Sequence, residues 1–315
     1  MKTPRLITVV PCYNEEEIIT DSNHKLVILY QKMIEEGLIT NDSKILYVND
    51  GSKDKTWTII SELHQHCKFV YGLNLAHNVG HQNALLSGLT IAKDISDIIV
   101  SIDADLQDDI QSIPEMVRKY QKGYDIVYGV RNKRTTDTWF KRNTALAFYR
   151  LMHWLGVKTV YNHADFRLMS KRAVHQLCQY QERNLFLRGI VPLIGYQTTS
   201  VYYDRAERLA GDSKYPFSKM LNFAIDGITS FSVKPVRMVF VLGIIFLLIS
   251  LCILIYVLHA LISGNAVKGW TSIILSIWLV GGCILIGLGI VGEYIGKIYI
   301  EVKKRPRYNI EQTLI

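Results

Sequence analysis

Short apolar runs alternate with longer amphipathic stretches over the first 100 residues of the chain. The apolar runs have the length and β-branched content of buried strands, and they lie at residues 6–10, 44–48, 69–73 and 98–100. The stretches between them have helical periodicity, and they lie at residues 16–36, 54–67 and 81–93. This alternation predicts βαβ units and a parallel, doubly wound α/β sheet.

Residues 124–214 have a less regular pattern. We expect a further strand at 125–129, a basic loop at 131–134 and a helix from 141 to about 155. Residues 162–169 alternate polar and apolar side chains, which is typical of a strand edge. That strand carries Asp165.

The last third contains two long apolar runs, at residues 238–258 and 269–292, without a charged residue in either. About 20 apolar residues cross a hydrocarbon core of about 30 Å, so each run is long enough to span a membrane. Two buried helices of a soluble domain are the alternative. About ten residues, 259–268, separate the runs, which predicts a helical hairpin. Lysine and arginine residues flank both runs and favour a cytoplasmic location for both ends.

Apolar residues also recur at helical spacing between residues 217 and 231. Directly before a membrane span, this pattern favours a helix in the membrane interface over an ordinary core helix. The predicted organisation is a catalytic domain (1–214), a juxtamembrane amphipathic helix (215–235), two membrane helices (236–296, the helices at about 238–260 and 270–292) and a cytoplasmic basic tail (297–315).

The formal net charge of +8 predicts an anionic partner: a phosphorylated substrate, an anionic lipid or a nucleic acid. Nucleic acid is disfavoured, because the cations cluster beside the apolar runs and lack interleaved aromatic residues. The five cysteines form no C-x-x-C pair. This argues against structural zinc and a disulfide framework, and it fits the cytosol.

Polar residues follow three of the predicted strands. Tyr13-Asn14-Glu15 follow the first, Asp50 follows the second, and an acidic stretch from Asp103 to Asp109 follows the fourth. Ligands of parallel α/β sheets bind beyond the carboxyl ends of the strands, so we expect these residues to share one edge.

Asp103, Asp105 and Gln107 are the candidate metal ligands. On an extended chain alternate residues point the same way, so their oxygens would converge on one hard cation, Mg²⁺ or Mn²⁺. Such a cation draws negative charge from a bound diphosphate, and the diphosphate is then a better leaving group. The alternative is an acidic turn that caps a helix beginning near Pro114. The chain lacks the glycine-rich motifs of dinucleotide and P-loop sites.

Several motifs appear in a recognisable order along the chain. They are Pro11-x-Tyr13-Asn14-Glu15, Asn49-Asp50-Gly51-Ser52, Asp103-Ala104-Asp105-Leu106-Gln107-Asp108, Asp165-Phe166-Arg167-Leu168-Met169, Arg208-x-x-Gly211-x-Ser213-Lys214-Tyr215 and Arg305-Pro306-Arg307-Tyr308. Together they resemble the family 2, GT-A fold polyprenyl-phosphate glycosyltransferases, the group that includes bactoprenol glucosyltransferases and dolichyl-phosphate mannose synthase. The resemblance covers essentially the whole chain.

This resemblance implies a mixed-sheet GT-A domain and inverting transfer of a sugar from a nucleotide-diphosphate sugar to undecaprenyl phosphate at the cytoplasmic membrane face. A UDP-hexose such as UDP-glucose is the expected donor, and a homotetramer is the expected assembly. The implied nucleoside site consists of Pro11, Tyr13, Asn14, Glu15, Val48 and Asp50. Asp103 and Ala104 would meet the ribose and diphosphate, with Asp105 and Gln107 on the metal.

The resemblance implies phosphate contacts for Arg131, Arg142, Arg208 and Lys214. The family often has lysine or arginine where this chain has His81, which puts a phosphate contact there in doubt. Asp165 is the candidate catalytic carboxylate, either as a base or as the residue that orients Arg167 and the acceptor. A hydroxyl acceptor needs a base, whereas a lipid phosphate is already largely anionic at neutral pH.

Three alternatives stay open. A processive polysaccharide synthase would carry Q-x-x-R-W, but residues 181–184 are Gln-Glu-Arg-Asn and no tryptophan follows. A transferase acting on a lipid hydroxyl shares the fold. A membrane-anchored nucleotide-binding scaffold without turnover is the third, and it is disfavoured because acids and cations meet at the same predicted edge.

Overall fold

The computed structural model describes residues 3–131, 163–183, 185–204 and 270–315, together with isolated positions between 236 and 252. The predicted helix at 141–155, the juxtamembrane helix at 215–235 and most of the first apolar run lie outside the described residues. The described chain forms two compact units. One contains residues up to 204 together with Arg305–Ile315, and the other contains residues 270–304.

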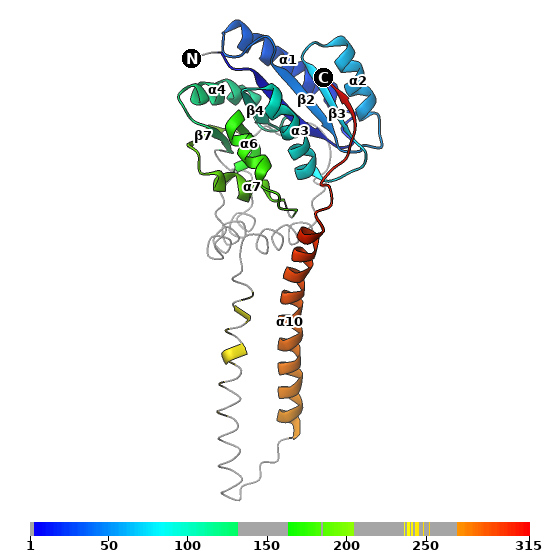
Figure 1. The fold of residues 1–315 in the computed structure, drawn as a ribbon, viewed down its shortest axis with the longest axis vertical. Helices are drawn as coiled ribbons and strands as arrows, with labels where there is room; N and C mark the ends of the chain where they lie inside the picture. Colours follow the sequence, from blue (N-terminus) through cyan, green and yellow to red (C-terminus); the bar gives the residue numbers. More distant parts are fainter. Residues whose placement is uncertain are drawn as a thin grey trace, which may run out of the picture. The chain divides into compact units, whose positions relative to one another are not determined.

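The first unit is built on a sheet whose described strands run in the order β7-β5-β6-β4-β1-β2-β3-β8 (Figure 1). Their bounds are β1 Leu6–Cys12, β2 Lys44–Asn49, β3 Val70–Leu75, β4 Ile98–Ser101, β5 Ile126–Arg131, β6 His163–Ser170, β7 Thr198–Tyr203 and β8 Ile310–Leu314. Four neighbouring pairs are parallel, while β6 and β8 run antiparallel to their neighbours. The sheet is therefore mixed, as the resemblance implied. An entirely parallel sheet was the wrong expectation.

Helices cover both faces of this sheet. Their bounds are α1 Ile19–Glu35, α2 Thr56–His66, α3 His81–Ile95, α4 Ile113–Gln121, α6 Lys171–Gln179 and α7 Leu187–Ile190. Alternate residues of a strand point to opposite faces. Thr8 of β1 accordingly accepts a hydrogen bond from Tyr30 of α1, at 2.8 Å, while Val9 packs against Gly88 of α3. This arrangement buries the central strands and leaves their carboxyl ends for the site.

The C-terminal residues complete the sheet. β8 pairs antiparallel with β3, opposite the side where β3 meets β2. The boundary at residue 214 therefore leaves out one strand of the catalytic domain, since the expected basic tail includes β8. A five-residue strand whose side chains are mostly exposed has no buried apolar face, so its sequence carries no strand signal.

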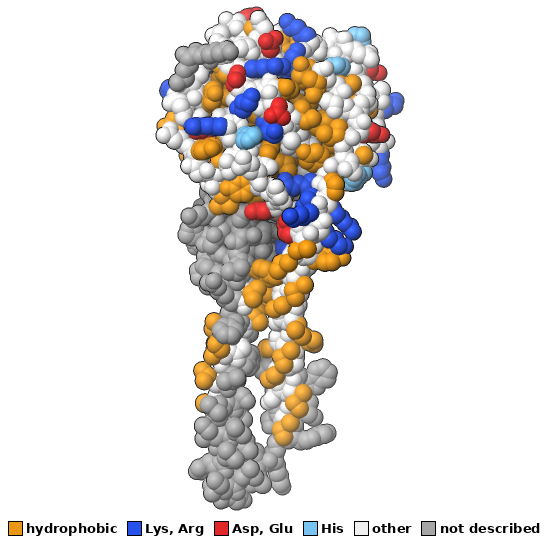
Figure 2. Space-filling model, viewed as in Figure 1, with side chains coloured by type: hydrophobic (Ala, Val, Ile, Leu, Met, Phe, Trp, Pro, Cys, Tyr) orange, Lys and Arg blue, Asp and Glu red, His pale blue; other side chains and the backbone are white. Residues whose placement is uncertain are grey.

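The second unit contains α10 (Trp270–Lys303), a helix of 34 residues. At a rise of about 1.5 Å per residue it is about 50 Å long, more than a hydrocarbon core requires. Within the described ranges one helical segment, Val280–Lys303, is long and apolar enough to cross a membrane. Figure 2 shows apolar side chains along its surface. The helix continues past the predicted end of the span at residue 292.

Candidate active site

The loops after β1 and β2 are locked to each other. The Asn14 amide donates to Ser52 Oγ at 3.0 Å, and the Lys53 amide donates to Asn14 Oδ1 at 2.9 Å. Asn14 adopts a left-handed backbone with φ of 54°, which asparagine tolerates better than most residues. The Glu15 amide donates to Thr56 Oγ1 at 2.9 Å, at the start of α2. Two of the predicted nucleoside residues are thus held in a rigid double loop.

Asp50 fixes the loop that leads into α3. Its carboxylate accepts hydrogen bonds from the amides of Val79 and Gly80, at 2.7 and 3.0 Å. Burial raises the pKa of this carboxyl, and the two amide hydrogen bonds oppose that rise. Next to it, Gly51 has φ of 59°, and a Cβ there would lie 2.5 Å from the backbone of residues 77 and 78. Asp50 therefore positions backbone, in addition to its predicted contact with the nucleoside.

The acidic loop between residues 103 and 109 is a turn. β4 ends at Ser101, the Leu106 amide donates to the Asp103 carbonyl at 3.2 Å, and Leu106 has φ of 45°. The expectation of an extended chain here was wrong, because the hydrogen-bonded turn removes the alternation of side chains. Asp103 has a side chain that is 47% exposed, whereas Gln107 is buried. In the described part of the chain, no group of three or more His, Cys, Asp or Glu residues forms a ready metal site.

Asp108, in the same loop, is bound by two neighbouring strands. Arg131 at the end of β5 donates to Asp108 Oδ1 from Nη2 at 2.8 Å, and the Tyr203 hydroxyl of β7 donates to the same oxygen at 2.7 Å. Asp108 is buried. Arg131, a predicted phosphate ligand, thus holds the acidic loop in place, and no sequence pattern predicted this pairing.

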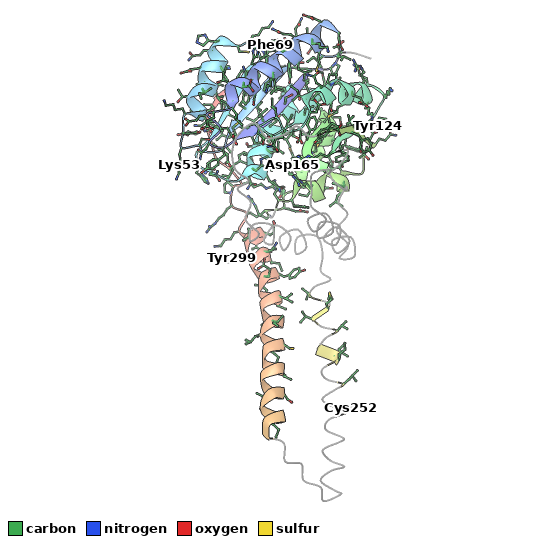
Figure 3. All side chains as sticks on the ribbon, turned by 180° about the vertical axis from the view of Figure 1, so that it is seen from behind. Lys53, Phe69, Tyr124, Asp165, Cys252 and Tyr299 are labelled. Carbon is green, nitrogen blue, oxygen red and sulfur yellow. The ribbon has the colours of Figure 1, made fainter. Side chains whose placement is uncertain are left out.

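Asp165 of β6 is labelled in Figure 3, and its carboxylate is bonded to two arginines. Arg167 Nη2 donates to Asp165 Oδ1 at 2.8 Å, and Arg188 Nη2 donates to Oδ2 at 3.0 Å. Burial alone would raise the pKa of Asp165, but the positive charges of Arg188 and Arg167 lower it well below its ordinary value. The carboxylate is therefore ionised throughout the neutral range and is a weak base.

His81, the first residue of α3, joins the acidic loop to this cluster. Its Nε2 lies 3.6 Å from Asp103 Oδ1 and 3.7 Å from Asp165 Oδ2. These separations are too long for hydrogen bonds but are within ion-pair range. Asp103 and Asp165, predicted from separate motifs, therefore belong to one site.

The prediction of the site from sequence missed Arg188. It lies in α7, a helix of four residues that the sequence pattern did not predict, and it has no motif of its own. Three predicted phosphate ligands, Arg142, Arg208 and Lys214, lie outside the described residues.

The fold and this cluster define an α/β enzyme with an acidic loop and a cationic cluster at one sheet edge. Residues 8–178 match the model of glycosyl transferase family 2, and the chain belongs to this family. The protein is thus a glycosyltransferase.

Several relatives are similar over the whole chain. The "Uncharacterized glycosyltransferase YkoT" of Bacillus subtilis is 55% identical, covering 99% of this chain and 92% of that protein. The "Prophage bactoprenol glucosyl transferase homolog" of Escherichia coli is 42% identical, covering 98% and 99%. Among solved structures, glucosyl-3-phosphoglycerate synthase from Mycobacterium tuberculosis is 16% identical with a TM-score of 0.45, covering 72% of this chain and 76% of that one.

Proposed function

We propose that this enzyme transfers a hexose from a nucleotide-diphosphate sugar to polyprenyl phosphate, with inversion at the anomeric carbon. Glucose carried by UDP is the first candidate for the sugar. The relatives named bactoprenol glucosyl transferase, 41% and 42% identical over 98% of this chain, support a polyprenyl carrier.

The state of Asp165 carries the proposal. A hydroxyl acceptor must lose its proton, and an efficient base for that step has a pKa near the working pH. The arginine pair holds the pKa of Asp165 far below that range. A phosphate acceptor, whose second pKa is about 6, is already largely anionic at neutral pH and needs no base. The arrangement therefore favours a lipid phosphate over a lipid hydroxyl.

In this mechanism the carboxylate of Asp165 orients two arginine side chains. It is bonded to Arg167, which is buried, and to Arg188, whose side chain is 35% exposed. Arg188 would bind the acceptor phosphate and hold one of its oxygens against the anomeric carbon. Fixed charge and position, instead of proton removal, then lower the barrier.

Asp103, Asp105 and Gln107 would hold Mg²⁺ or Mn²⁺. The half-exposed carboxylate of Asp103 is open to a cation that takes most of its ligands from a bound diphosphate and water. When bound, such a cation supplies positive charge beside the leaving diphosphate. Tyr13, Glu15 and Asp50, with their neighbours Pro11, Asn14 and Val48, would hold the nucleoside.

We further propose that residues 236–296 form a two-helix membrane hairpin with both chain ends in the cytoplasm. Gly287 of α10 supports close packing of the two segments, because a Cβ there would lie 3.1 Å from Val239 Cγ1. Small residues allow membrane helices to approach closely. The juxtamembrane helix would then lie in the interface beside the lipid phosphates.

A panel of nucleotide sugars with undecaprenyl phosphate tests the proposal. The full-length protein in lipid nanodiscs should form one lipid-linked hexose, detected by mass spectrometry, with release of one nucleoside diphosphate. Failure of every donor with undecaprenyl phosphate, together with turnover on ceramide or another hydroxyl lipid, would overturn the choice of acceptor.

A further inference from the structure

The short helix α7 carries Arg188 and depends on other elements for its position. It is a single turn of four residues, Leu187–Ile190. One turn gains too few internal hydrogen bonds to be stable alone. The residue before it, Phe186, provides no side-chain hydrogen bond to the first amides of the helix, which need partners from elsewhere. Contacts from outside α7 must therefore set the position of Arg188.

The helix α3 supplies one of these contacts. Oε1 of Gln82 accepts a hydrogen bond from the Leu187 amide at 2.8 Å. A backbone N–H group only donates hydrogen bonds, so Gln82 turns the oxygen of its side-chain amide toward α7. The hydrogen bond thus holds the backbone of the residue directly before Arg188, and it satisfies an amide in the first turn of a helix that has no side-chain cap of its own.

Apolar burial also holds α7 but does not replace this hydrogen bond. The side chains of Leu187 and Ile190 are buried, so they keep α7 against the rest of the domain. Burial of apolar surface has no preferred direction, whereas a hydrogen bond requires a narrow range of distances and angles. We therefore expect the bond from Gln82 to fix the orientation of the turn.

The contact between Arg188 and Asp165 is sensitive to that orientation. Nη2 of Arg188 lies 3.0 Å from Asp165 Oδ2, and Nε lies 3.3 Å from Asp165 Oδ1. Most N–H···O hydrogen bonds have lengths of about 2.7–3.2 Å, so the second contact is already long. A small shift of α7 would break it, and the guanidinium would then be held by one hydrogen bond in place of two.

The first two residues of α3 contact both sides of this pair. His81 Nε2 lies 3.7 Å from Asp165 Oδ2, and Gln82, the next residue, binds the backbone beside Arg188. These two contacts come from one helical turn, so they share a single support. The start of α3 thus holds the carboxylate and the arginine in a fixed relation to each other.

We infer that Gln82 is a positioning residue of the acceptor site, which holds α7 so that Arg188 presents its guanidinium to the acceptor phosphate. The inference rests on the proposed function, because it requires Arg188 to bind that phosphate. Gln82 acts through the backbone of α7 and need not touch either substrate. Its removal should therefore weaken acceptor binding and leave donor binding unchanged.

Four variants test this role. Gln82→Met keeps the length of the side chain and removes its amide oxygen, while Gln82→Ala removes both. Gln65→Met is the matched control, because it places the same substitution on the exposed surface of α2. Arg188→Gln removes the cation itself and tests the proposed function.

The measurement is the KM of undecaprenyl phosphate and the KM of the donor, together with kcat and Tm, for the full-length protein in nanodiscs. Both Gln82 variants should raise the acceptor KM about fivefold and keep the donor KM within about twofold, as expected for the loss of one hydrogen bond that acts on the acceptor site alone. Gln65→Met should match the unmodified protein in all four quantities.

A raised acceptor KM in Arg188→Gln beside an unchanged one in Gln82→Met would overturn the inference alone. A fall in Tm and kcat of Gln82→Met with an unchanged acceptor KM, which a merely structural role would give, would do the same. So would an equal rise of donor and acceptor KM, or a rise confined to Gln82→Ala, which would indicate lost packing. An unchanged acceptor KM in Arg188→Gln would contradict the proposed role of Arg188, and the inference would fail with it.

Discussion

Arg188 donates hydrogen bonds to both carboxylate oxygens of Asp165, from Nη2 at 3.0 Å and from Nε at 3.3 Å. This forked contact orients the arginine more tightly than a single hydrogen bond would. It also keeps Asp165 ionised, with Arg167 on its other side. The pair links a short helix, α7, to the start of β6. The role of Asp165 is thus to orient the two arginine side chains.

Asp165→Asn should therefore slow sugar transfer without abolishing it. Asparagine keeps one oxygen for the arginines but loses the charge that orients them. We expect a rate reduced by about 10²-fold or less, from lost positioning. Between pH 5 and 8, the pH–rate profile of this variant should show no new fall in rate toward acidic pH. Complete loss of turnover with normal folding, or a basic shift of the pH profile in the variant, would restore Asp165 as the base.

Asp165→Ala should destabilise the protein. It leaves the buried Arg167 without its carboxylate, and removing one partner of a buried ion pair costs about 3–5 kcal/mol. The folded-state pKa of Asp165 is lowered, so its contribution is complete above an ordinary pKa of about 3.9 and is lost as the pH falls below that value. Denaturant unfolding should show the difference from the unmodified protein shrinking between pH 5 and pH 2. A constant difference would contradict this account.

Asp105→Ala should abolish transfer, because it removes a proposed metal ligand beside the leaving diphosphate. EDTA should stop the unmodified enzyme in the same way, and added Mg²⁺ or Mn²⁺ should restore it. Release of nucleoside diphosphate reports both results. Normal turnover of Asp105→Ala with EDTA present would show that the metal assignment is wrong.

Comparing two glycines with similar backbone angles distinguishes the cost of backbone strain from the cost of a steric clash at Cβ. Gly37 and Gly51 have φ of 67° and 59°, but a Cβ meets nothing within 4 Å at Gly37 and meets backbone at 2.5 Å at Gly51. Gly37→Ala should cost about 1 kcal/mol with unchanged catalysis. Gly51→Ala should cost more and raise the donor KM, since residues 77 and 78 must move away from the Asp50 loop. Equal unfolding free energies and KM values for the two variants would contradict the tight approach at Gly51.

The alternation of apolar runs located β1 to β4 and the helices between them, because these elements bury a regular apolar face. It also predicted that Asp50 and Asp103 lie at one edge of the sheet, since parallel strands share their carboxyl ends. It could not locate β8, which has no apolar face, or the backbone turn at Leu106. Partners such as Arg188 for Asp165, or Arg131 for Asp108, are set by tertiary packing and leave no periodic signal.

The choice between phosphate and hydroxyl acceptors tests the central claim most directly. Undecaprenyl phosphate and undecaprenol present the same chain, and they differ only in the group that attacks the sugar. With the preferred nucleotide sugar, the enzyme in nanodiscs should release nucleoside diphosphate in step with lipid-linked hexose when undecaprenyl phosphate is present, and it should stay inactive with undecaprenol. Comparable turnover on undecaprenol would contradict the proposal that Asp165 orients two arginine side chains at a phosphate site and does not act as a base.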